Sequence, residues 1–359
     1  MNHRTRCAFT LPEALAVALI VGALGSCVIV GMAGVGPIKG ALDSSSRHRQ
    51  LGQAQGVYMG EHMGRYAGVN TSGALYQARA IVPGEGVVLA SDLLLGDTTS
   101  STPTQVQDWI SPIMGESVNL NANRALRTAN ILNKLGDPRA TRLNDLLFGN
   151  ADDASDFEAV HMTSGFRQVS YLQPRAFQMY SSRSDNVPEA PGDLLIGGIS
   201  LGDRLRTEHP GAPALVPVDF EPNINNVGVS PAAKVMHADG TRYFSTDAGL
   251  DISIETNPDF NGNFVDSGPI SHTSAAYGRD FPAAPGNLDL SFRGRDGTML
   301  ATMFDGSLRT FTREQAWTDP TPWFPSGSTF TGSNATPESI GFAIKNFAPS
   351  KDGLGYVVP

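Results

Sequence analysis

A long uncharged segment near the N-terminus constrains this chain more than any other feature. Residues 14–38 carry no charged side chain, and Glu13 stands at the edge of the run. A helix rises about 1.5 Å per residue, so about 25 residues are enough to cross a hydrocarbon core of roughly 30 Å. We therefore expect a membrane-spanning helix over 9–38 that continues as a more polar helix over 39–68. A carboxylate such as Glu13 is costly in lipid and usually marks function.

The residues around this edge resemble the processing signal of type IV pilins and type II secretion pseudopilins, including planctomycete-type prepilin-like proteins. A basic leader over 1–8 ends at Ala8, Phe9 follows, and Glu13 is the fifth residue after that point. The resemblance implies cleavage between Ala8 and Phe9 by a prepilin peptidase and methylation of Phe9. It also implies that Glu13 directs assembly by pairing with the N-terminal amine of a neighbouring subunit. Ala8 stands where the family more often has glycine, and Pro12 where it has an aliphatic residue.

The resemblance implies a structural and non-enzymatic role, as a subunit of a type IV pilus-like filament or a type II secretion pseudopilus. The partners would be the prepilin peptidase, other pilin or pseudopilin subunits in a homo-oligomeric filament, and membrane lipid, with no nucleic acid. The expected location is the inner membrane, in a single pass, with the head exported to the periplasm or cell surface. The expected fold class is α+β, with a long N-terminal transmembrane helix and a β-rich, pilin-like head over 69–359 that carries a helical insertion.

Two other interpretations of the N-terminus stay open, and both make the chain a surface-anchored binding module without a filament role. Residues 24–27 end in Cys27 and have the small-residue pattern of a lipidation site, although the apolar run continues beyond it. A plain signal anchor is the other interpretation. Basic residues flank both ends of the apolar run, so charge alone does not fix the orientation.

The amino-acid composition limits the kind of fold and the kind of partner that are expected for the region after the apolar run. The chain has 359 residues and a formal net charge of -9, and an acidic chain without basic clusters is a poor match for nucleic acid. Its two cysteines are Cys7, in the leader, and Cys27, in the apolar run, so we expect no disulfide in the head. Many glycines and prolines (39 and 24) together with only 17% charged residues favour short strands and turns.

Glycine recurs at every fourth position after the apolar run, at Gly52, Gly56, Gly60, Gly64 and Gly68. Each interior glycine costs a helix about 0.5–1 kcal/mol relative to alanine, so the repetition suggests a compensating role. Small residues on one ridge allow another backbone to approach closely. We therefore assign the first four glycines to helix packing, and an irregular segment is the alternative.

Further along the chain, local patterns predict several elements and a bend. They are a bend at 44–46, a helical insertion within 119–148, strands over 166–172 and 194–199, and hairpins over 234–245 and 298–312. Each hairpin is centred on an Asp-Gly pair, which readily adopts the positive φ angles of a tight turn. The second pair, Asp305-Gly306, also resembles a C-terminal hairpin of the prepilin-like families.

One segment has the oxygen-rich spacing of a calcium loop. Its candidate ligands are Asp259, Asn261, Asn263 and Asp266. Phe264 stands where the helix–loop–helix calcium motif requires glycine, so an ordinary Asx-rich turn is the alternative. The sequence implies no other cofactor. The histidines His161, His209, His237 and His272 lack zinc spacing, and we expect each to be solvated or hydrogen-bonded.

Overall fold

The computed structural model describes residues 36–68, 71, 98–105, 108–140, 142, 146–147, 153–178, 180–181, 195–196, 199–200, 213–240, 250–251, 292, 297–333 and 335–359. By its contacts the chain divides into two units, Met1–Leu42 and Asp43–Pro359. The described residues belong to the second unit, except for the first residues of helix α2.

The described residues form a mixed α and β structure. The α-helices are α2 (Gly36–Glu61), α5 (Ile110–Met114), α6 (Arg124–Ala129), α7 (Ala154–Thr163), α9 (Arg313–Thr318) and α10 (Pro337–Asn346). A π-helix, η2 (Asn130–Leu135), extends α6, and the 3₁₀-helices are η3 (Arg175–Phe177), η4 (Ile224–Asn226), η5 (Pro231–Ala233) and η8 (Thr321–Trp323). The strands are β1 (Leu146–Leu147), β2 (Tyr171–Leu172), β3 (Leu195–Ile196), β4 (Ile199–Ser200), β5 (Ala214–Leu215), β6 (Val235–Asp239), β7 (Leu250–Asp251), β8 (Met299–Met303), β9 (Leu308–Phe311), β10 (Thr329–Phe330), β11 (Ala348–Pro349) and β12 (Tyr356–Val357).

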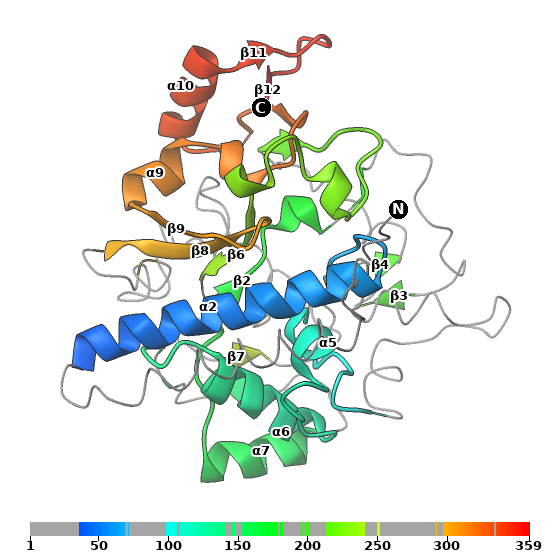
Figure 1. Ribbon diagram of the computed structural model, residues 1–359, viewed down its shortest axis with the longest axis vertical. Helices are drawn as coiled ribbons and strands as arrows, with labels where there is room; N and C mark the ends of the chain where they lie inside the picture. The colour runs from blue at the N-terminus through cyan, green and yellow to red at the C-terminus, as the bar shows by residue number, and fades with distance from the viewer. Residues whose placement is uncertain are drawn as a thin grey trace, which may run out of the picture. The chain divides into compact units, whose positions relative to one another are not determined.

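Two four-stranded antiparallel sheets organise the fold (Figure 1). The first, with strand order β2-β6-β8-β9, is called the central sheet below. The second has the order β11-β12-β10-β5, and all four of its strands have two residues; β10, β11 and β12 come from the C-terminal part of the chain, and β5 comes from much earlier. The remaining strands pair as β1 with β7, in parallel, and β3 with β4.

Helix α2 lies between the central sheet and the helices α5, α6 and α7 (Figure 1). One hydrophobic cluster joins these layers: it contains Leu51 and Tyr58 of α2, the buried side chains of α5 to α7, and Tyr171 of β2. The buried side chains of α2 nevertheless lie along one face, and the opposite face, which includes Gly56 and Val57, is exposed. The inner face of α2 is therefore the structural centre of this half of the molecule.

A second hydrophobic cluster covers the opposite face of the central sheet. Ala238 of β6 and Ala301 of β8 pack there against aromatic side chains that include Trp323 and Phe330. Helix α9 begins with a capping box, in which Thr312 and Gln315 satisfy each other's backbone N–H groups. The short C-terminal elements thus pack on the sheet face that α2 leaves free.

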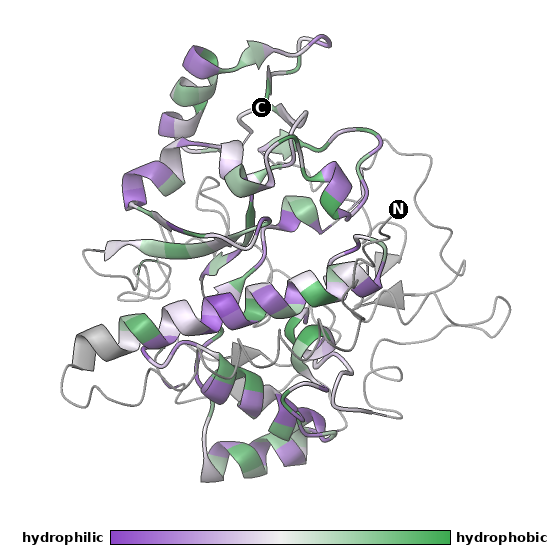
Figure 2. Cartoon of the chain, viewed as in Figure 1, coloured by the Kyte–Doolittle hydropathy of each residue, from purple (hydrophilic) through white to green (hydrophobic). Residues whose placement is uncertain are grey.

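The structure corrects the predicted fold class and the predicted single-pass location in the inner membrane. Within the described residues, no helix is both long enough and apolar enough to cross a membrane. Helix α2 has 26 residues, but it carries charges such as Asp43, Arg47 and Arg49, which are costly in hydrocarbon. Hydrophilic and hydrophobic residues alternate along it (Figure 2). Of the predicted span 9–38, residues 9–35 lie outside the described part of the chain.

The structure confirms some of the predicted local elements and contradicts others. The hairpin around Asp305-Gly306 is confirmed: β8 pairs with β9, and Gly306 has a φ of +83°. The helix expected within 119–148 is confirmed as α6 and η2. The tight turn at Asp239-Gly240 is wrong, since Gly240 is not among the glycines with positive φ and its N–H donates to Ser170 O. The bend at 44–46 is also wrong, because α2 runs through it.

Candidate functional site

The inner face of α2 carries polar side chains that are completely buried. Ser44, His48 and Gln55 are each 0% exposed, and they share a helical face with Leu51 and Tyr58. Buried polar groups are costly unless they are hydrogen-bonded, so this face requires partners on the elements that cover it. Those partners come mainly from the central sheet, and they bring several ionisable groups together around the hydroxyl of Thr302.

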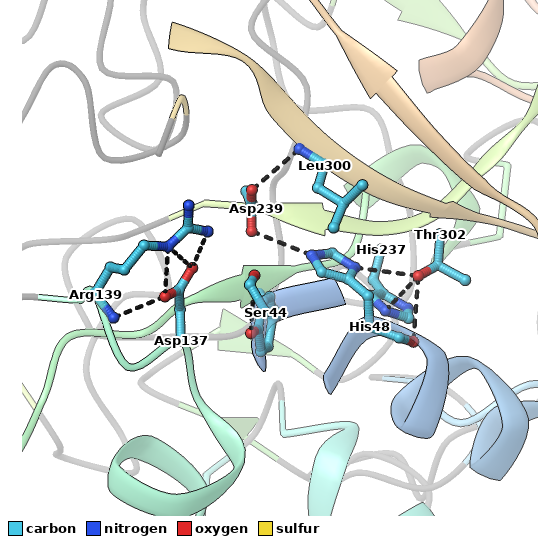
Figure 3. Close-up of polar contacts among 9 residues, drawn as sticks. Ser44, His48, Asp137, Arg139, His237, Asp239, Leu300 and Thr302 are labelled. Atoms are coloured by element: carbon cyan, nitrogen blue, oxygen red, sulfur yellow. Dashed lines mark hydrogen bonds and ion pairs between the residues drawn. The ribbon is translucent and has the colours of Figure 1, made fainter. Parts of the chain in front are cut away.

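His48 joins α2 to two strands of the central sheet (Figure 3). Its Nε2 lies 3.1 Å from Oδ1 of Asp239 on β6, and its Nδ1 lies 3.1 Å from Oγ1 of Thr302 on β8. An ionised carboxylate only accepts hydrogen bonds, so Nε2 of His48 carries a proton. We call His48, His237, Asp239 and Thr302 the His48 network.

Thr302 is the centre of the network. Its Oγ1 lies 2.9 Å from Nε2 of His237 and 3.3 Å from the backbone oxygen of His48, in addition to the contact with His48 Nδ1. A hydroxyl has one hydrogen and two lone pairs, so it can serve all three contacts only if it donates once and accepts from the others. The protonation states of the two histidines therefore determine which way the Thr302 hydroxyl points.

An irregularity in β6 directs His237 toward α2. The register pairs Val235 with Met303 and His237 with Thr302, so Met236 is an extra residue in the strand. A bulge of this kind turns two successive side chains to one face. Accordingly, both Met236 and His237 lie on the side of α2, whereas Val235 belongs to the cluster on the opposite face.

Asp239 is held by the sheet as well as by the helix. Its Oδ2 accepts the backbone N–H of Leu300 at 3.0 Å, across from β6 on β8. Nearby, Arg139 donates to Asp137, with Nη2 and Oδ2 2.6 Å apart (Figure 3). Burial works to lower the pKa of Arg139, but the hydrogen bond and charge of Asp137, with smaller effects of Asp239 and Tyr171, raise it above its ordinary value. The carboxylate of Asp239 therefore lies in the field of a fixed cation.

The ring of His237 packs against two other aromatic rings. Its ring stacks on that of His48, with centroids 5.1 Å apart and an interplanar angle of 11°, and the ring of Trp109 is also 5.1 Å away. Its Nδ1 is buried and has no hydrogen-bond partner among the described residues. Burial, and secondly the neighbouring His48, lower the pKa of His237 well below its ordinary value of 6.5, although a hydrogen bond to the backbone of His48 opposes the shift. His237 is thus neutral at neutral pH.

The order Thr302–His48–Asp239 is that of a nucleophile, a base and an orienting acid. The exposure of these residues argues against such a use: Asp239 is 1% exposed and the other two are 0% exposed. The Thr302 hydroxyl faces two imidazoles and a backbone carbonyl rather than solvent, so a substrate would have to displace α2 to reach it. The arrangement is suited to fixing the helix on the sheet with a defined register and orientation.

The four glycines assigned to helix packing occupy different environments. A Cβ added at Gly52 would lie 2.8 Å from Cγ2 of Thr302, so the helix touches β8 there. A Cβ at Gly56 or Gly60 would meet no heavy atom within 4 Å. Gly64 lies beyond the end of α2, with a φ of +83° and the side chain of Asn223 close by. Gly52 is thus packed within the chain, whereas Gly56 and Gly60 face outward.

The other site residues predicted from the sequence lie outside the described part of the chain. They are the processing and assembly residues Ala8, Phe9 and Glu13, and the calcium candidates Asp259, Asn261, Asn263 and Asp266. Within the part that is described, no group of three or more His, Cys, Asp or Glu side chains is placed to hold a metal ion. These assignments remain predictions.

His48 is not among the site residues predicted from the sequence, although its spacing from neighbouring residues indicates a buried position on a helix. It lies four residues after Ser44 and three before Leu51, which is the spacing of one helical face. A histidine on the apolar face of an amphipathic helix requires a buried partner. Which partner it finds could not be read, because Asp239 and Thr302 are 191 and 254 residues away in the chain.

Comparison with known proteins found no matching family model, no matching curated protein and no matching solved structure.

Proposed function

We propose that this chain is a structural subunit of a filament that resembles a type IV pilus or a type II secretion pseudopilus. A prepilin peptidase would cleave it between Ala8 and Phe9, and Phe9 would then be methylated. The N-terminal sequence supports this proposal most directly, since a basic leader, Ala8, Phe9 and Glu13 occur at the spacing of the family's signal. The role that we propose for the chain is structural and not catalytic.

In the structure, the proposal is supported by the difference between the two faces of α2. On one side, His48 and Gly52 fix the helix to the central sheet of its own subunit. On the other side, Gly56 and Gly60 are open and Val57 is 62% exposed. A filament subunit needs such a helix, because one face must carry its own head while the other contacts neighbouring subunits.

Glu13 has a specific role in this proposal. A carboxylate buried between subunits needs a positive partner, because an unpaired buried charge is strongly destabilising. Cleavage after Ala8 creates one, since the new N-terminus at Phe9 carries an amine. Pairing of Glu13 in one subunit with that amine in the next would set the axial register of the filament.

Substitution of Glu13 tests the proposal. We expect Glu13→Ala to leave the thermal unfolding of the head unchanged and to reduce incorporation into filaments severely, because the partner of the neighbour's amine is lost. Glu61→Ala, at the last position of α2, is a matched control that removes a carboxylate from an exposed site and should assemble normally. Filaments recovered by shearing would be quantified for both variants and the wild type. Normal assembly of Glu13→Ala would refute the proposed role.

A further inference from the structure

We propose that the His48 network is a pH-dependent latch between α2 and the central sheet. The network keeps the helix on the sheet when it carries no added proton or one added proton. When the network binds a second proton, the helix is released. The inference concerns the folded head alone, and it does not rest on the filament role proposed above.

With both histidines neutral, the network forms a chain in which each hydrogen is used once. His237 Nε2–H donates to Thr302, Thr302 donates to His48 Nδ1, and His48 Nε2–H donates to Asp239. The lone pair of His237 Nδ1 is left without a partner among the described residues, and the 3.3 Å contact between Thr302 Oγ1 and the backbone oxygen of His48 has no hydrogen in this state. A bare buried acceptor is tolerated better than a buried charge without a partner.

One added proton is accommodated without breaking a contact. If His48 takes it, Nδ1–H donates to Thr302, and the Thr302 hydroxyl turns to the backbone oxygen of His48, which lies 3.3 Å away. His237 continues to donate to Thr302. The charged His48 then forms an ion pair with Asp239 at 3.1 Å. The first proton is therefore compatible with a docked α2.

A second proton would have to go to Nδ1 of His237, where nothing in the described surroundings accepts it. The groups that face this ring are His48 from α2, Thr302 from β8, Trp109 ahead of α5 and, at 6.5 Å, the ring of Tyr171 from β2. None of them is an anion, and His48 would be a like charge stacked at 5.1 Å. The carboxylate of the network, that of Asp239, is already bonded to His48.

The sign of the pH dependence follows from the lowered pKa of His237 in the folded chain. The unfolded or undocked chain binds this proton below about pH 6.5, while the docked state resists it until a lower pH. Docking is therefore fully favoured above about pH 6.5 and weakens as the pH falls below it. The docking equilibrium should change by about tenfold per pH unit in that window.

Hydrogen exchange of the full chain tests the latch at about pH 7.5 and about pH 5, with intrinsic rates corrected. We expect peptides over 44–58 to lose at least about tenfold in protection at the lower pH, while peptides over 336–346 change little. His237→Gln keeps an N–H donor for Thr302 but cannot be protonated, so its α2 peptides should stay protected. His62→Gln replaces an exposed histidine just beyond α2 whose ring stacks on Tyr58, so a wild-type response of this variant excludes His62 as the source of the pH dependence.

Two results would overturn the proposal. The first is unchanged protection of α2 in the wild type at the lower pH. The second is an equally steep loss in His237→Gln at the same pH, which would assign the release to Asp239 instead. If His237→Gln does not fold, NMR titration of His237 in the wild type decides the question. The latch requires its protonation to coincide with the loss of α2 protection, and a pKa at or above the ordinary value contradicts it.

Discussion

Lys234 is the most thoroughly buried amine in the described residues, at 1% exposed. Its Nζ donates to the backbone oxygens of Thr321, at 2.8 Å, and Pro359, at 2.7 Å. These two contacts connect the start of β6 with segments that pack around the second sheet. Burial lowers the pKa of Lys234 to about 8, and the charge of Asp319 opposes the shift without cancelling it.

The lowered pKa of Lys234 makes the free energy of unfolding depend on pH in the alkaline range. The pKa of Lys234 is about 8 in the folded chain, against an ordinary value of 10.5 for a solvated lysine, so between these values the unfolded chain binds more protons. The free energy of unfolding of the wild type should therefore rise, relative to that of Lys234→Gln, by up to about 1.4 kcal/mol per pH unit from about pH 8 to pH 10. Paired denaturant melts of both proteins measure this difference. A difference that is constant over the range would contradict the lowered pKa.

The buried position of His237 could not be predicted from the sequence. His237 was expected to be solvated or hydrogen-bonded, and the structure finds it buried with Nε2 bonded to Thr302. That outcome depends on the extra residue Met236 in β6, which turns the imidazole toward α2. Nothing in the local sequence indicates this bulge.

At the scale of elements, α2 offers a comparison of two glycines four residues apart. Gly52→Ala would place a Cβ 2.8 Å from a methyl group of Thr302, whereas Gly56→Ala would place one in open space. We expect Gly52→Ala to lower the free energy of unfolding by about 1–2 kcal/mol through overpacking. Gly56→Ala should raise it by about 0.5–1 kcal/mol through helix propensity.

Thermal and denaturant melts of the full chain check both variants under one set of conditions. Each variant is the control for the other, since the chemical change and the helix are the same. If both alanines shift stability in the same direction, the close approach of α2 to β8 at Gly52 is contradicted.

The two Asp-Gly pairs show why equal sequence signals gave unequal results. Asp305-Gly306 connects β8 directly to β9, and the Asp305 side chain closes the turn by accepting from Ser307. At Asp239-Gly240, the aspartate is recruited by His48 and by Leu300 N–H, and β6 pairs with β2 and β8. Local turn propensity decided the first case, and tertiary partners decided the second.

At the scale of the whole molecule, the sequence predicted local elements better than their arrangement. The apolar stripe ahead of Gly136 identified the helical segment that becomes α6 and η2. The expected fold with a membrane-spanning helix is corrected by the structure, in which the described helices carry too much charge or are too short. The site was not predictable as a unit, because it joins α2, β6 and β8 through contacts between residues far apart in the chain.

The N-terminal residue of the mature protein tests the proposed function most directly. Mass spectrometry of the protein isolated from its native source would identify the first peptide and its modification. The proposal predicts a peptide that begins at Phe9, with a methylated amine, and no peptide from residues 1–8. A mature chain that keeps Met1, or one that begins at Cys27 with an attached lipid, would contradict it.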